Sequence, residues 1–240
     1  MQIHHSDKRT KKDWRKALLD AREARSPQAC ELEDRQIAKH LDAWVEGYLQ
    51  SAGAQYEQPE LLVYWPWRGE PDLRELWRRW HSRGLRLHLP VVVGRDAPLA
   101  ARRWNPTGDP NEDFVEDALG LPVPRPDSSR AVAGEAEGFG DVEVSALAEA
   151  SAAAELPRAP AWLIPCVGVD AGGHRIGAGM GFYDRTLSEC LQRGQPRPLL
   201  IGICRSQAVV SENLSEPHDL RLDTLVTEHG LTPVRDSAGA

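Results

Sequence analysis

The residues best suited to chemistry lie in one short segment, residues 170–185, which reads DAGGHRIGAGMGFYDR. Three glycines alternate there between a predicted strand and a predicted helix: Gly177, Gly179 and Gly181. Backbone N–H groups and a helix N-terminus at such a place can bind an anion. Arg175 would add positive charge, and Asp184 could hold a divalent cation against the same phosphates. The segment predicts a phosphate-binding site, and its alternative is a tight connection between a strand and a helix.

A second cationic element lies far away in the sequence. Apolar residues recur every three or four positions over residues 11–25, which predicts an amphipathic helix that carries Lys11 and Arg15 on another face. Neither the P-loop nor the dinucleotide fingerprint matches the glycine segment. Together with the acids Asp184 and Asp219, however, the helix and the glycine segment supply the groups that nucleotide-dependent phosphoryl transfer needs. We therefore expect the helix and the glycine segment to converge on one polyphosphate.

Other candidate residues have ordinary alternatives. Glu70 follows a predicted strand at the end that faces the crevice of a parallel sheet, so it is either a ligand contact or an acid at a helix start. His218 has no partner at metal-ligand spacing, and we expect a polar loop histidine. The arginine-rich run at 77–86 could bind RNA by stacking, but Trp77 and Trp80 fall on an apolar stripe, so we expect them in the core.

The composition describes a soluble chain with one core. The chain has 240 residues, of which 41% are hydrophobic and 27% charged, with a net charge of −7 and a mean hydropathy of −0.48. No apolar run approaches the eighteen or so residues of a membrane-spanning helix, and no apolar region follows the basic start. Four cysteines without a C-x-x-C pair indicate buried thiols of a reducing compartment. We expect a cytoplasmic monomer without membrane contact, and an acidic chain is not built to bind nucleic acid over its whole surface.

The elements that must position these residues alternate between helix and strand. Helices are predicted over residues 11–25, 29–50, 70–84 and 183–192, and strands over residues 60–65, 85–93, 161–165 and 199–204. This order implies parallel crossovers, and the predicted fold is a single layered α/β domain with a mostly parallel central sheet flanked by helices. Residues 127–160 are rich in Ala, Glu, Gly, Ser and Pro, which predicts a mobile insert and not a second domain.

Several segments, taken in chain order, match the motif pattern of one enzyme family. They are KKDWR at 11–15, the strand and glutamate turn at 64–72, LHLPVV at 87–92, LGLPVP at 119–124, the block at 163–185, GIC at 202–204, and His218-Asp219 followed by Asp223 and VTE at 226–228. On these motifs the chain resembles the 5-formyltetrahydrofolate cyclo-ligases, also called methenyltetrahydrofolate synthetases. The resemblance runs from Lys11 to Gly230 without the insert, and the block at 163–185 is its most specific part.

The resemblance implies an ATP- and Mg²⁺-dependent cyclisation of 5-formyltetrahydrofolate to 5,10-methenyltetrahydrofolate, with release of ADP and phosphate. The formyl oxygen would be phosphorylated, and N10 would then displace the phosphate. The implied catalytic residues are Lys11 and Arg175, and the implied metal ligands are Asp184 and Asp219. The implied ATP contacts are Lys11, Arg15, Arg175, Gly177, Gly179 and Gly181. The implied substrate contacts are Trp65, Glu70, Leu119, Met180, Phe182 and Tyr183. The alternative is a non-catalytic folate- or RNA-binding member of the same fold, which would not consume ATP.

Overall fold

A seven-stranded sheet forms the centre of the computed structural model, which describes residues 9–52, 58–107, 113–125, 155–216 and 219–235. In spatial order the strands are β11 (Gly230–Pro233), β10 (Thr224–Thr227), β9 (Leu199–Ile203), β6 (Ala161–Pro165), β1 (Glu60–Leu62), β2 (Arg86–Val91) and β3 (Ala100–Trp104). The strands from β10 to β2 are parallel, whereas β11 and β3 pair antiparallel at the two edges. The prediction of a mostly parallel α/β sheet is confirmed.

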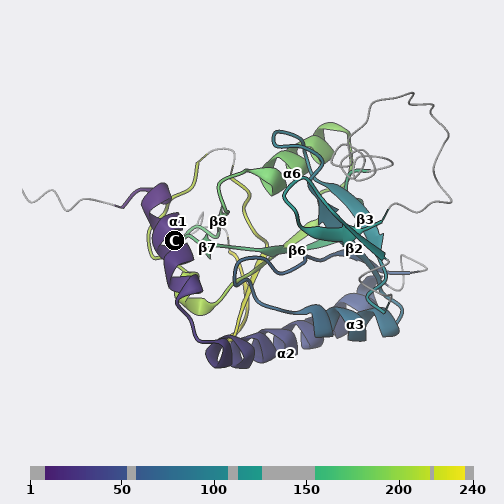
Figure 1. Cartoon of the computed structure of the whole chain (residues 1–240), viewed down its shortest axis with the longest axis horizontal. Helices are drawn as coiled ribbons and strands as arrows, with labels where there is room; N and C mark the ends of the chain where they lie inside the picture. Colours follow the sequence, from purple (N-terminus) through teal and green to yellow (C-terminus); the bar gives the residue numbers. More distant parts are fainter. Residues whose placement is uncertain (1–8, 53–57, 108–112, 126–154, 217–218, 236–240) are drawn as a thin grey trace, which may run out of the picture.

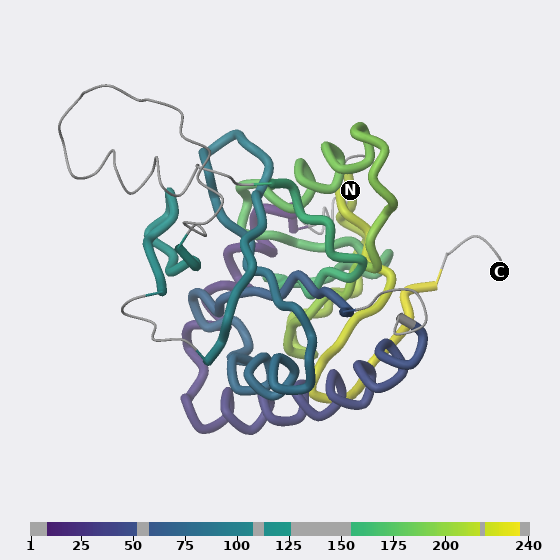
Figure 2. Tube along the Cα trace, turned by 90° about the vertical axis from the view of Figure 1, so that its right-hand side faces the viewer, coloured from purple at the N-terminus to yellow at the C-terminus, as the bar shows by residue number. Residues whose placement is uncertain are grey.

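Helices cover both faces of the sheet. Those in the described part of the chain are α1 (Lys11–Glu23), α2 (Pro27–Ala52), α3 (Arg74–Ser82) and α6 (Phe182–Gln192). Figure 1 shows α2 and α3 below the sheet, α6 above it, and α1 beside the short strands β7 and β8. Figure 2 shows the yellow C-terminal strands β10 and β11 alongside α2. No helix among the described residues has both the length and the apolar character needed to cross a bilayer.

Alternating side chains divide the core into two layers. Successive residues of a strand face opposite sides of the sheet, so Leu61 packs in the cluster with α2 and α3, whereas Leu62 packs in the cluster under α6. Trp77 and Trp80 of α3 are fully buried in the first cluster, as the apolar stripe predicts. Cys190 of α6 and Trp162 of β6 lie in the second cluster. These two layers hold the carboxyl ends of the central strands in place.

Two short hairpins complete the part of the fold that positions the site. One joins β4 (Phe114–Glu116) to β5 (Pro122–Pro124), and the other joins β7 (Gly168–Val169) to β8 (Arg175–Ile176). A 3₁₀ helix, η2 (Ser206–Ala208), follows β9. Most of the predicted insert lies outside the described residues. Of its last residues, the carbonyl of Glu155 accepts a hydrogen bond from the backbone of Ala101 in β3.

Some predicted boundaries differ from the observed ones. The first predicted strand, 60–65, ends at Leu62, although the Val63 amide still donates to the carbonyl of His88. The predicted helix over 70–84 begins only at Arg74, because the residues before it form a turn in which the Glu70 amide donates to the Trp67 carbonyl. The other predicted helices and strands match the observed elements within about two residues, the usual uncertainty of an element boundary.

Candidate active site

The N-terminal helix and the glycine segment meet at one end of the sheet. Arg15 Nε of α1 donates a hydrogen bond of 2.8 Å to the carbonyl of Gly177. The ammonium group of Lys11 forms an ion pair with the Asp219 carboxylate. A capping box between Thr10 and the first turn fixes the start of α1, which places both cations. The predicted convergence of two segments more than 160 residues apart is therefore observed.

The glycines give the connection between β8 and α6 a shape that other residues would not adopt. Gly179 and Gly181 have φ values of 101° and 64°, in the left-handed region that glycine favours. At Gly177 a Cβ atom would lie 2.8 Å from the guanidinium nitrogens of Arg175. Gly181 is also the N-cap of α6, and the first turn of a helix leaves backbone N–H groups without intrahelical acceptors. Cations and backbone donors therefore surround the space where an anion would bind.

Arg175 is the most deeply buried cation of this group. Its side chain is 7% exposed, its Nη2 lies 3.2 Å from Oδ2 of Asp184, and its guanidinium carbon lies 5.1 Å from the Tyr183 ring centre. Its Nε is buried and has no hydrogen-bond partner within the described ranges. Buried polar groups normally have a partner. The orphaned donor therefore fits an anionic ligand such as a phosphate.

The two acids predicted to hold a metal ion lie close together. The Leu220 amide donates to Asp184 Oδ1 at 2.9 Å, and Leu220 follows Asp219 directly. Each acid already faces a cation, Arg175 for Asp184 and Lys11 for Asp219. Among the described residues, no group of three or more possible ligands could hold a metal ion. Because Mg²⁺ is commonly bound by one or two carboxylates and the phosphates of a nucleotide, this pair fits a shared ion.

An apolar cavity of about 120 Å³ adjoins the glycine turn. All six predicted substrate contacts line it: Trp65, Glu70, Leu119, Met180, Phe182 and Tyr183. Arg175 and Gly181 line the same cavity, so its wall is continuous with the anion site. A larger cavity of about 860 Å³ beside Trp162 and Cys190 contains none of the predicted site residues. We place the site in the smaller cavity because it adjoins the glycine turn and is lined by the buried side chains of Glu70 and Arg175.

Glu70 is the buried acid of the cavity. Its Oε2 accepts a 3.0 Å hydrogen bond from the Trp67 amide, and its Oε1 lies 4.0 Å from Nη1 of Arg22. Burial raises the pKa of Glu70 to about 7, although the charge of Arg22 opposes the shift. A buried carboxyl that lines a cavity and has a strongly shifted pKa is a candidate functional group.

Several residues of the candidate site were not predicted. Trp67 lines the cavity, and Asp117 holds the Leu119 turn by accepting hydrogen bonds from the amides of Val92, Leu119 and Leu121. Arg22 lies beside Glu70 and also donates to the carbonyl of Cys166. The Trp-Pro-Trp run and the Asp-Ala-Leu-Gly turn are the local signals that point to Trp67 and Asp117.

The remaining sequence candidates have structural roles or lie outside the described residues. In α3, Arg78 and Arg79 pair with acids, at 3.1 Å and 3.2 Å, and the indole of Trp80 donates to Asp42 at 2.8 Å. The two tryptophans of the arginine-rich run are therefore not available for stacking on a base. The four cysteines are free; three are buried, as predicted, whereas Cys30 is half-buried. His218 lies outside the described residues.

The fold and the site define a layered α/β domain in which a cationic glycine turn adjoins a buried apolar cavity. The family model of the 5-formyltetrahydrofolate cyclo-ligases matches residues 7–228, and the chain therefore belongs to this enzyme family. It is 29% identical to a 5-formyltetrahydrofolate cyclo-ligase of Mycolicibacterium smegmatis over 231 residues, 95% of each chain. A mouse 5-formyltetrahydrofolate cyclo-ligase is 28% identical over 65 residues, which are 27% of this chain and 32% of the mouse protein.

Solved structures show the same fold. The NMR structure of Aquifex aeolicus 5,10-methenyltetrahydrofolate synthetase superposes with a TM-score of 0.61 at 23% identity, over 96% of this chain and 95% of that one. A 5,10-methenyltetrahydrofolate synthetase from Mycoplasma pneumoniae superposes with a TM-score of 0.57 at 20% identity, over 91% and 98% of the two chains. The resemblance seen in the sequence motifs is thus confirmed for the family and the fold.

Proposed function

We propose that this protein catalyses the ATP- and Mg²⁺-dependent cyclisation of 5-formyltetrahydrofolate to 5,10-methenyltetrahydrofolate, with release of ADP and phosphate. Membership of the cyclo-ligase family supports the reaction class. The observation that carries the proposal is the contact of Arg15 with Gly177, because it brings the cationic helix to the glycine turn beside the apolar cavity. A polyphosphate and an apolar ring system could then be bound side by side.

The chemistry explains why such a pairing is needed. The formyl oxygen on N5 belongs to an amide and is a poor leaving group. Transfer of the γ-phosphoryl group of ATP to that oxygen converts the oxygen into part of a phosphate leaving group. The lone pair of N10 then attacks the formyl carbon. The carbon–oxygen bond then breaks, phosphate leaves, and N10 loses its proton. Positioning and charge neutralisation provide most of the catalysis of such a sequence.

The anion site supplies these two effects. Lys11, Arg15 and Arg175 would bind the triphosphate together with the amides around Gly177, Gly179 and Gly181. Arg175 and Lys11 are the proposed catalytic residues, because Arg175 borders both the turn and the cavity and Lys11 lies beside Asp219. Asp184 and Asp219 would hold Mg²⁺, which neutralises phosphate charge when it is bound.

The cavity would bind the folate. Trp65, Leu119, Phe182 and Tyr183 would surround the reacting groups and exclude water, which protects a reactive intermediate from hydrolysis. Met180 belongs to the glycine turn and lines the cavity, so it would contact the substrate there. Glu70 would accept hydrogen bonds from N–H groups of the reduced pterin ring. Those donors would stabilise its carboxylate form and offset the burial that raises its pKa.

The direct test mixes the purified protein with ATP, Mg²⁺ and 5-formyltetrahydrofolate and records the absorbance of methenyltetrahydrofolate. A single-turnover measurement of ADP, with and without the folate, accompanies it. We expect ADP and methenyltetrahydrofolate in equal amounts, and only when all three components are present. Folate binding without ADP formation, in a folded sample, would support the non-catalytic alternative. We further expect a cytoplasmic monomer; the free thiols agree with a reducing compartment.

A further inference from the structure

A buried ion cluster lies behind the turn that carries Glu70, outside the cavity wall. Its centre is Arg205, which follows β9 and is 6% exposed. Nη1 of Arg205 donates to the carbonyl of Gly69 at 2.9 Å, and Nη2 donates to Asp34 Oδ1 at 2.6 Å. Nε lies 2.8 Å from Oε2 of Glu33. One guanidinium thus joins the end of β9, the first turns of α2 and the turn at Gly69.

Asp34 extends this connection to the other side of Glu70. Its second oxygen, Oδ2, accepts a 3.0 Å hydrogen bond from the Asp72 amide. Arg205 and Asp34 therefore hold the backbone at Gly69 and at Asp72, with Glu70 between the two points. Neither Arg205 nor Asp34 lines the cavity, so neither touches a ligand bound there.

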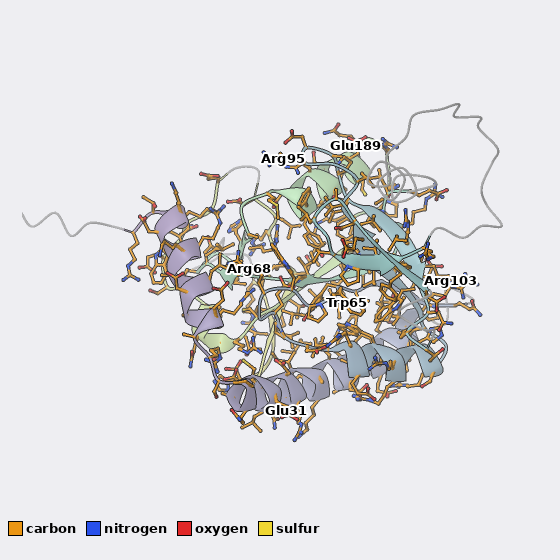
Figure 3. The ribbon with its side chains drawn as sticks, in the orientation of Figure 1. Glu31, Trp65, Arg68, Arg95, Arg103 and Glu189 are labelled. Carbon is orange, nitrogen blue, oxygen red and sulfur yellow. The ribbon has the colours of Figure 1, made fainter. Side chains whose placement is uncertain are left out.

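The turn has a shape that needs such support. Arg68, with φ of 46°, and Gly69, with φ of 72°, both occupy the left-handed region, which is unfavourable for arginine. Figure 3 shows Trp65 near the middle of the molecule and Arg68 between it and α1. Within the turn, the Glu70 amide donates to the Trp67 carbonyl at 3.1 Å and the Glu70 carboxylate accepts from the Trp67 amide. The direction of the carboxylate therefore depends on the shape of the turn.

We propose that Arg205, together with Asp34, is a positioning residue of the cyclisation: it holds the turn at 66–72 so that the Glu70 carboxylate faces the folate. The functional part of this inference rests on the proposed reaction. The structural part, that the ion pair orders the turn, does not depend on it. Asp34 must be ionised to hold Arg205. Burial raises the pKa of Asp34 to about 6, although the hydrogen bond from the Asp72 amide and the charge of Arg205 both lower it. The experiments therefore belong at about pH 8, where Asp34 is charged.

The test compares Arg205→Met, Asp34→Asn and the control Arg197→Met. Arg197 is a matched control because it also joins an aspartate, Asp223, to a backbone carbonyl, but at the opposite end of β9. Hydrogen exchange of a peptide covering residues 66–72 is measured first. We expect about tenfold faster exchange in both test variants and no change in the control, while peptides from α6 exchange alike in all proteins.

Steady-state kinetics then test the functional part. We expect KM for 5-formyltetrahydrofolate to rise about tenfold in Arg205→Met while KM for ATP stays within about twofold. Arg205→Lys should recover part of the loss, because lysine keeps the charge without the planar set of donors. If Arg205→Met does not fold, Asp34→Asn decides alone.

Each result has one meaning for the proposal. Unchanged exchange at 66–72 in a folded test variant overturns it, as does a parallel rise of both KM values. Altered exchange with an unaltered folate KM overturns the functional part. An inactive wild-type protein with altered exchange in the variants would refute the proposed reaction and leave the support of the turn established.

Discussion

Replacing Gly177 by alanine would displace the Arg175 guanidinium without changing any charge. The backbone of Gly177 is outside the left-handed region, so alanine fits its conformation. The added Cβ would lie 2.8 Å from both terminal nitrogens of Arg175, whereas ordinary contact begins at 3.4 Å. The guanidinium must therefore move by about 0.6 Å, the difference between these two distances. Its 3.2 Å contact with Asp184 and any contact with a phosphate would be misaligned.

Hydrogen bonds to charged groups contribute about 1.5–3 kcal/mol each. Loss of one such contact in the transition state should lower kcat/KM by roughly 10- to 150-fold. The unfolding temperature should change little, because a compatible Gly→Ala change stabilises by about 0.4–1 kcal/mol and the displaced group is the end of a flexible side chain. The assay is methenyltetrahydrofolate formation at varied ATP, with thermal unfolding measured in parallel.

Gly47→Ala is the control for this experiment. Gly47 lies inside α2 with no atom within 4 Å of an added Cβ, so the change should leave kcat/KM unaltered and stabilise the helix by about 0.5–1 kcal/mol. If a folded Gly177→Ala protein retained activity within about twofold of wild type, the position assigned to Arg175 in catalysis would be refuted. A loss of activity matched by an equal loss of stability would refute it as well.

Three further predictions concern the metal ion, Glu70 and the arginine-rich helix. Asp184→Asn should raise the Mg²⁺ concentration for half-maximal activity about 10- to 100-fold with little change in unfolding temperature, and an unchanged Mg²⁺ requirement would contradict the metal assignment. The pKa of Glu70 rises from 4.5 to about 7 on folding. Between pH 4.5 and about pH 7 the carboxyl is therefore protonated in the folded protein and ionised in the unfolded chain. The free energy of unfolding thus falls as the pH rises through this window. Relative to Glu70→Gln, wild type should lose roughly 3 kcal/mol between about pH 4.5 and pH 8 in urea titrations, and parallel curves would count against the buried carboxyl. Arg78→Gln with Arg79→Gln should leave turnover within about twofold, whereas salt-dependent RNA binding that disappears in this double variant would favour the RNA-binding alternative.

The central elements were predictable because their own residues decide them. The apolar stripe of α3 and the apolar run of β6 indicate the type of element and its buried face from nearby residues alone. Both elements lie where the pattern predicts. The edge strands were missed for the opposite reason. β3 contains two arginines in the middle, and β11 is short and contains glycine and proline, so neither has a strand signal of its own. Pairing with β2 and β10 makes them strands.

The site divides in the same way. The glycine spacing and the cations at Lys11 and Arg15 are local signals, so the sequence could predict that these segments form a candidate anion site. The contacts of Arg22 with Glu70 and of Arg205 with Asp34 join segments that no spacing relates. The residues around Arg205 form no distinctive motif. The role proposed for Arg205 therefore depends on contacts that only the fold creates. The proposed support of the Glu70 turn depends on residues that are distant in the sequence, and no local pattern indicates it.

The density of site residues at 175–184 has a geometric cause. α6 begins at Phe182, directly after the left-handed N-cap Gly181, which turns the chain from the candidate anion site into the helix. Successive helical residues point about 100° apart, so the first turn can serve two neighbouring sites. Phe182 and Tyr183 line the cavity, whereas Asp184 faces Arg175 and the residues after Asp219. The first helical turn thus separates the proposed folate side from the proposed phosphate side. A residue inserted after Gly181 would rotate the side chains that follow by about 100° and should abolish methenyltetrahydrofolate formation.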